Sequence, residues 1–245
     1  MKSLSIINVA GLLMDGKNDG LEAALRQRVT PDFLRTIAPT SLDSATKHPN
    51  EAIEHAIVMI RRAMQDVKES TGDPNIVLVG RSYGAFIALL ASIRMNFQNI
   101  TRVVLIEGPL HPDVLVAPPM LLPPLMICDS HYQMRPVLAR EAVEHLSALG
   151  PSPLVISQGQ AQDDVVPIAS QVIPGDFRSM NVDRMFSSHH EIDHDRGSVV
   201  RLPRSIGGEC HGMKRILPDG YRNHLFWSKE KMDMILDIFE ATLRV

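Results

Sequence analysis

The chain has 245 residues, of which 44% are hydrophobic and 22% are charged, with a formal net charge of −3. This is the composition of a globular protein, and a net acidic chain makes nucleic acid a poor partner. No run of about 18 apolar residues is present to span a membrane. The two cysteines, Cys128 and Cys210, form no disulfide framework, which suits a reducing compartment and predicts a cytoplasmic protein.

The first segment with a structural signal is the apolar run Leu4–Val9. Together with Lys2 it weakly resembles a signal peptide, but no A-x-A cleavage site follows. A polar stretch rich in Gly and Asp begins at Asp15 instead. We therefore interpret the run as a buried strand that leads into a loop.

Further short apolar runs and helical repeats alternate along the chain. A continuous apolar, β-branched run predicts a central buried strand at 76–80, and shorter apolar runs predict strands at 34–37, 103–106 and 153–157, with 213–217 as a possible last strand. Apolar residues at helical spacing predict helices at 21–28, 51–64 with Asn50 as N-cap, 83–96, 139–149 and 228–243. This alternation predicts an α/β protein with a mostly parallel central sheet flanked by helices.

Two segments interrupt the alternation. Residues 108–135 are rich in proline, and residues 171–212 are rich in Ser, His, Asp, Arg and Gly. We predict one domain, 1–245, with an inserted apolar cap or lid at about 108–135 and a polar loop insertion at about 171–212. The leucines and methionines of 114–127 would form an adaptable wall for an acyl or alkyl group; packing as core is the alternative.

The sharpest motif is Gly80-Arg81-Ser82-Tyr83-Gly84, a G-x-S-x-G between a predicted strand and a predicted helix. A serine on such a tight turn projects its hydroxyl above the sheet, and the crowding excludes side chains two residues before and after it. The Tyr83 amide would then face a developing oxyanion at the helix N-terminus. A glycine-rich turn of a nucleotide-binding protein is the alternative interpretation.

In this context the chain resembles the α/β-hydrolase superfamily, over most of its length. Residues 4–14 resemble the strand before the oxyanion loop, 76–85 the nucleophile strand and elbow, 153–167 the acid strand and loop, and 217–238 the histidine loop and closing helix. The family's first hairpin is absent, and Ala10-Gly11 stands where His-Gly is common. The resemblance implies a serine hydrolase whose oxyanion donors are the amides of Leu12 and Tyr83.

The resemblance also implies an acid and a base, in the order serine, acid, histidine. Asp163 fits the D-x-x-V-P spacing, Asp164 is hard to separate from it, and Glu107 at a predicted strand end is a remoter candidate. His224 precedes the closing helix and is the favoured base. His211 follows two glycines and a possible strand at 198–202, so it stays an alternative.

A rival pattern is His190-Glu191-Ile192-Asp193-His194, which reads H-E-x-x-H, a zinc-protease signature, with Glu209 or His211 as a conceivable third ligand. Such a site needs a helix, and the following Asp195-Arg196-Gly197-Ser198 ends one at once. We interpret the segment as a hydrated polar loop whose histidines, His189 included, could touch a substrate.

The sequence therefore predicts a serine hydrolase that cleaves a carboxylic ester, or a thioester or amide, of a small apolar substrate, by a Ser82–His224–Asp163 triad without metal or cofactor. Two alternatives remain: a non-hydrolytic binding protein or lyase on the same scaffold, and the zinc hydrolase. The partner expected is a small ester-like molecule.

Overall fold

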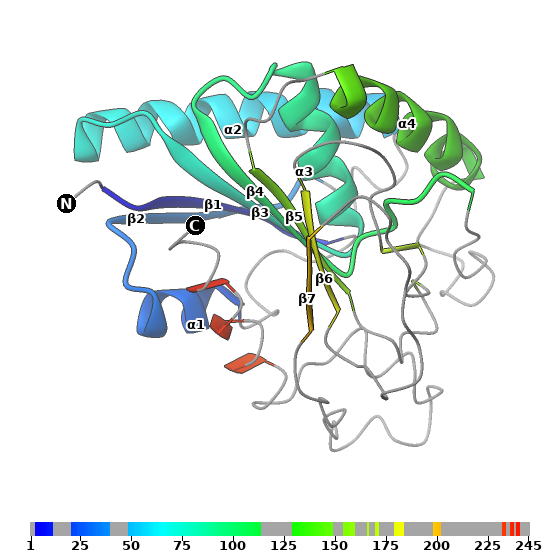
Figure 1. Ribbon diagram of the computed structural model, residues 1–245. Coiled ribbons are helices and arrows are strands. Elements are labelled where there is room, and N and C mark those ends of the chain that lie inside the picture. Colours follow the sequence, from blue (N-terminus) through cyan, green and yellow to red (C-terminus); the bar gives the residue numbers. More distant parts are fainter. Residues whose placement is uncertain are drawn as a thin grey trace, which may run out of the picture.

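Parallel strands form the centre of the computed structural model (Figure 1). The structure describes residues 3–11, 21–39, 49–113, 129–148, 154–159, 166, 170–171, 179–183, 198–201, 232–233, 236–237 and 239–240. Within these residues the strands are β1 (Ser5–Val9), β2 (Phe33–Ile37), β3 (Ile76–Arg81), β4 (Ile100–Ile106), β5 (Leu154–Gly159), β6 (Ser179–Asp183) and β7 (Ser198–Arg201). They pair in the order β2-β1-β3-β4-β5-β6-β7, every pair parallel.

Helices cover both faces of this sheet, as the sequence predicts. In Figure 1, α2 (Pro49–Thr71), α3 (Tyr83–Arg94) and α4 (Asp129–Ala148) lie over one face, and α1 (Leu21–Arg28) lies under the other. Successive side chains of β3 enter opposite cores: Leu78 packs with the α2–α4 side, and Val77 and Val79 pack with α1. The central strand is thus buried on both faces, which explains its uninterrupted apolar sequence.

The long helix α2 departs from its predicted bounds at both ends. It starts at Pro49, so Asn50 lies inside the helix rather than capping it. Proline suits a first helical position because the amide it lacks would have no partner there. The helix continues to Thr71 and ends at Gly72, whose φ of 76° provides the left-handed residue that closes a helix.

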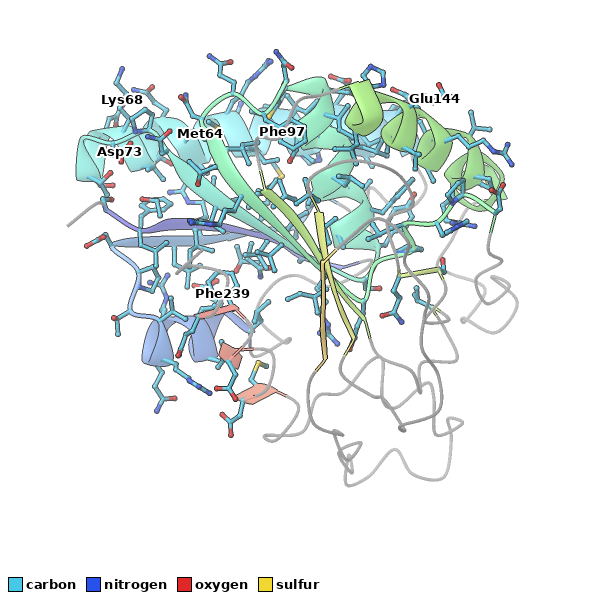
Figure 2. The ribbon with its side chains drawn as sticks, in the orientation of Figure 1. Met64, Lys68, Asp73, Phe97, Glu144 and Phe239 are labelled. Carbon is cyan, nitrogen blue, oxygen red and sulfur yellow. The ribbon has the colours of Figure 1, made fainter. Side chains whose placement is uncertain are left out.

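The C-terminal helix predicted at 228–243 is helical at each of its described positions. Leu236 and Phe239 pack into the core beside α1, where Figure 2 shows Phe239 beneath the sheet. Arg28 at the end of α1 pairs with Asp237 and with Glu240 at 2.9 Å. The described residues of this last helix are therefore held against α1 by apolar burial and by an ion-pair cluster.

Both predicted insertions contain regular structure. The second part of the predicted cap belongs to α4, which starts at Asp129 and accommodates Pro136 within the helix at the loss of one backbone hydrogen bond. Residues 114–128 lie outside the described residues. The predicted polar loop 171–212 is not all loop, because β6 and β7 lie within it.

The strand β6 was missed because it reads Ser-Met-Asn-Val-Asp, without the apolar run that marks a buried strand. Its alternation of apolar and polar residues is a weaker signal over only five positions. The strand β7 confirms the possible strand noted at 198–202. Among the described residues, no helix is both long and apolar enough to cross a membrane.

Candidate active site

Ser82 lies between the last residue of β3 and the first residue of α3, as the motif predicts. Its backbone angles are φ 53° and ψ −131°, a region that residues with a side chain rarely occupy. The side chain is half-buried. Strain of this kind persists only where the surrounding structure enforces it, and it is concentrated at functional positions.

Two backbone hydrogen bonds enforce the turn. The Ser82 amide donates to the Ile106 carbonyl of the neighbouring strand at 2.8 Å, and the Ala85 amide donates to the Ser82 carbonyl at 3.0 Å. Since the Ser82 amide is bonded to Ile106, an oxyanion at this turn would be held by amides of later or other residues. Tyr83, the first residue of α3, carries the next amide along the chain.

The two glycines of the motif are required by close packing. A Cβ on Gly80 would lie 2.6 Å from the Gly84 carbonyl oxygen and from the Ala85 Cα. A Cβ on Gly84 would lie 2.4 Å from the carbonyl oxygens of Val9 and Ala10. The first turn of α3 therefore rests directly on the carboxyl end of β1.

This contact places the chain leaving β1 beside the serine turn. The Ala10 amide donates to the Ile37 carbonyl at 2.9 Å, which fixes the end of β1 to β2. Gly11 is the last described residue here, and Leu12, the predicted second oxyanion donor, lies outside the described residues. Tyr83 is half-buried and packs against Phe86, with ring centroids 5.5 Å apart.

A second strained residue lies beside the serine. Glu107, the residue after β4, has a φ of 53° and is 1% exposed. The sheet register pairs Arg81 with Ile106, so Ser82 and Glu107 are the next residues along two neighbouring strands. Gly108 packs on the elbow, because a Cβ there would lie 2.6 Å from the Ala85 Cβ.

The loop that follows Glu107 is fixed from two directions. Arg135 of α4, 4% exposed, donates to the His111 carbonyl at 2.8 Å and to the Pro109 carbonyl at 3.5 Å. The Ser170 carbonyl accepts hydrogen bonds from the amides of Leu110 at 2.7 Å and His111 at 2.9 Å. No pattern in the sequence predicts this arrangement, since a single arginine in a helical stretch is expected to be exposed.

Through Ser170, the post-β4 loop is joined to the segment that follows β5. The Gln171 side chain in that segment donates to the Val166 carbonyl. Val166 is buried and is the Val of the D-x-x-V-P pattern that begins at Asp163. The end of the candidate acid segment is therefore tied to the loop that packs on the elbow.

His111 has an unusual environment within this loop. Burial lowers the pKa of its imidazole, the nearby Arg135 charge lowers it further, and the Asp113 carboxylate opposes both. The Asp113 amide donates to the His111 Nδ1 at 3.1 Å, which requires that nitrogen to be unprotonated. Burial and this hydrogen bond both favour the neutral imidazole.

The other predicted site residues lie outside the described residues: Asp163, Asp164, His211, His224 and the H-E-x-x-H histidines His190 and His194, together with Glu209. The strand required before His211 is present as β7, whereas the strand predicted before His224, 213–217, lies outside the described residues. Within the described residues, no group of three His, Cys, Asp or Glu side chains could hold a metal.

Comparison with known proteins adds evidence on the fold. No protein-family model and no curated protein matches the sequence. Est1E from Butyrivibrio proteoclasticus with bound ferulic acid matches with a TM-score of 0.58 at 11% identity, over 99% of this chain and 88% of that chain. The metagenome-derived lipolytic enzymes LipS and LipT give a TM-score of 0.55 at 11% identity, over 100% and 96%.

A third similar structure carries the name of the fold. Alpha/beta hydrolase domain-containing protein 10 from mouse matches with a TM-score of 0.50 at 12% identity, over 99% of this chain and 90% of that chain. At such low sequence identities, the structural similarity is evidence for the fold alone. The parallel sheet, the strand–serine–helix turn and these likenesses together establish that the chain has the α/β-hydrolase fold.

Proposed function

We propose that the protein is a serine hydrolase that cleaves a carboxylic ester, with thioester or amide as close variants, of a small apolar substrate. The observation that carries the proposal is the strained backbone of Ser82 at the junction of β3 and α3. A surface turn has no reason to keep a non-glycine residue in this conformation, whereas a nucleophile must be presented above the sheet.

The proposed chemistry gives each residue one role. Ser82 attacks the carbonyl carbon, and a histidine accepts its proton and returns it to the leaving group. We assign these proton transfers to His224 and the orientation of its imidazole to Asp163. The amides of Tyr83 and Leu12 hold the oxyanion, aided by the N-terminal dipole of α3.

The proposal draws on three supporting observations. Gly84 rests on the end of β1, so the chain that carries Leu12 leaves the sheet beside the serine. The D-x-x-V-P segment is tied through Gln171 and Ser170 to the loop beside the elbow. The structural neighbours described above include lipolytic enzymes and Est1E with bound ferulic acid.

The proposal also includes the substrate pocket and the cellular compartment. We assign the apolar wall of the substrate pocket to the cap residues 114–127, which would favour an acyl or alkyl group. We also propose that the chain is one domain, with the cap inserted between β4 and β5. The compartment proposed is the cytoplasm, on the low cysteine content.

The test is Ser82→Ala, assayed on a short p-nitrophenyl ester. We expect kcat to fall by about a thousandfold or more with an unchanged thermal melt, because removal of a triad member disables the unit. A fluorophosphonate probe should label wild-type Ser82 only, as read by mass spectrometry of the peptide. A chelator should leave the activity intact, whereas a zinc hydrolase would lose it.

Near-normal turnover by Ser82→Ala, with contaminating esterase excluded, would contradict the proposal. Absence of labelling and of ester turnover in the folded wild-type protein would instead favour a binding protein or lyase on the same scaffold.

A further inference from the structure

Two large hydrophobic side chains are exposed in the described part of the chain, and both lie on the outer helix layer. Val58 of α2 is 44% exposed, and Val137 of α4 is 53% exposed. The helix α3, which contacts both of these helices, is buried along most of its length. In Figure 2, Lys68 of α2 and Glu144 of α4 point away from the sheet on this side. Isolated valines are ordinary on a protein surface, so the residues around them decide their meaning.

An ion-pair bridge connects the surroundings of the two valines. Arg94, at the end of α3, pairs with Glu54 of α2 at 3.2 Å and with Glu141 of α4 at 3.9 Å. Val58 follows Glu54 by four residues, and Val137 precedes Glu141 by four. Each valine therefore lies one helical turn from the bridge, on the same side of its helix. We call the surface formed by these five residues the α2–α4 face.

The charges on α2 are divided about Val58. Glu51 and Glu54 precede it by seven and four residues, and Arg61 and Arg62 follow it by three and four, all four with exposed side chains. These spacings place them on the same side of the helix as Val58. The helix dipole favours an acid in the first turn, but it does not explain two arginines in the middle of a 23-residue helix. Neither Glu51 nor either arginine forms an ion pair with another described residue.

We propose that the α2–α4 face binds a second copy of this chain, with the two α2 helices antiparallel across a twofold axis at Val58. In this arrangement the acidic half of each α2 faces the basic half of the other, and Glu51 lies opposite Arg62 of the partner subunit. Two parallel α2 helices would place like charges together, so the charge pattern selects the antiparallel orientation. The exposed valines provide the apolar part of the contact. The inference does not depend on the proposed hydrolase function.

The size of the face sets the strength of the expected dimer. With 23 residues and a rise of about 1.5 Å per residue, α2 is about 34 Å long. A helix about 10 Å wide then contributes roughly 340 Å² on each protomer, and the turn of α4 around Val137 extends this area. The total stays below the about 800 Å² per partner of a standard stable interface. We therefore expect a reversible dimer with a dissociation constant of about 10–100 µM that salt weakens.

The experiment is sedimentation velocity of the full chain from about 1 µM to about 500 µM. Wild type should show a monomer–dimer equilibrium whose dissociation constant rises about tenfold between about 50 mM and about 500 mM salt. Arg62→Glu and Glu51→Arg each place like charges together at two symmetry-related positions, so each should raise the dissociation constant about tenfold or more. A mixture of the two variants should associate, because their heterodimer pairs opposite charges at both positions.

Lys68→Glu is the matched control. It makes the same change of charge as Arg62→Glu on the same helix, but six residues further along and about 120° around the helix axis. Lys68→Glu should dimerise like wild type. A thermal melt of each variant checks the fold, and because Glu51 and Arg62 are tested separately, one misfolded variant leaves the other to decide.

Four results would overturn the inference. The first is wild type that sediments as a monomer at about 500 µM in about 50 mM salt. The second is a folded Arg62→Glu or Glu51→Arg with the wild-type dissociation constant. The third is a mixture of these two variants that associates no better than each variant alone. The fourth is a weakening in Lys68→Glu equal to that in Arg62→Glu, which would make net charge, and not the α2–α4 face, the cause.

Discussion

Two glycines of this protein differ in what an added methyl group would meet. A Cβ on Gly84 would lie 2.4 Å from two backbone carbonyl oxygens, so the elbow or β1 would have to move. A Cβ on Gly72 meets nothing within 4 Å, and only the φ of 76° opposes a side chain. Alanine substitutions at these two glycines should therefore distinguish loss of activity at the site from loss of folding stability.

We therefore expect Gly84→Ala to lower kcat by about a hundredfold, since a displacement near 1 Å at a reacting group costs that much. Gly72→Ala should retain wild-type kcat and lose about 1–2 kcal/mol of unfolding free energy, the usual penalty for a left-handed residue with a side chain. Ester kinetics and denaturant unfolding measure the two effects. Equal loss of kcat in both variants would contradict the close packing at Gly84.

At the same scale, the lowered pKa of His111 predicts that the folding stability depends on pH. Burial lowers its pKa below the unfolded value of 6.5, so the unfolded chain takes up a proton more readily than the folded one. The neutral imidazole therefore favours the fold above pH 6.5, and this stability is lost as the pH falls below that value. Protonation would also remove the acceptor of the Asp113 amide.

The test is the melting temperature at pH 7.5 and pH 5.5 in wild type and in His111→Asn, whose side-chain oxygen replaces the acceptor but does not titrate. The melting temperature of the variant should fall less from pH 7.5 to pH 5.5 than that of the wild type. An identical loss in both proteins would show that other groups, such as Glu22, account for the acid sensitivity.

At the scale of elements, the sequence predicts a strand where an apolar run marks it and misses the strand β6, whose residues alternate between polar and apolar. The runs at 76–80 and 103–106 lie within β3 and β4, because those strands are covered on both faces. The strand β6 carries polar residues at alternate positions and gave no such run. The serine elbow was predictable for a similar reason, since its crowding admits only glycine at 80 and 84.

The positions of β6 and β7 bear on which histidine acts as the catalytic base. Both run parallel to β3, so their carboxyl ends lie at the same edge of the sheet as Ser82. His189, His190 and His194 follow β6 in the sequence, and His211 follows β7. The choice of His224 depended instead on a strand at 213–217 and on proximity to the last helix.

A histidine scan decides among them. We expect His224→Ala to reduce kcat as severely as Ser82→Ala, because nucleophile and base act as one unit, and His211→Ala to be mild. Alanine variants of His189, His190 and His194 complete the series, with a thermal melt for each. If a histidine after β6 or β7 is the one whose loss abolishes turnover, the segment 213–227 has no part in the chemistry.

At the scale of the whole molecule, the order of the strands could not be predicted from the sequence. Strand alternation indicates a parallel sheet, but which strand lies beside which depends on contacts between distant segments. The structure places β4 between the strand that precedes Ser82 and the strand that precedes Asp163. Glu107, the residue after β4, therefore lies beside the serine turn. The proposed cap residues 114–127 follow β4 in the sequence.

The role of that cap is testable through chain-length preference. If residues 114–127 wall the pocket, each substrate methylene buried there is worth about 0.8 kcal/mol, or about fourfold in kcat/KM. Leu121→Ala and Leu122→Ala should therefore shift preference among esters of two-, four-, six- and eight-carbon acids. A segment that is only core would lower the melting temperature and reduce all four activities equally.

Because the Ser82 amide is hydrogen-bonded to Ile106, hydrogen exchange at this amide reports on the opening of the central sheet. An amide bonded between two central strands exchanges its hydrogen with heavy water only when those strands separate. Exchange at Ser82 should therefore occur at the rate of global opening, far more slowly than exchange in a surface turn. A substrate that contacts only residues 114–127 should therefore not slow the exchange of this amide.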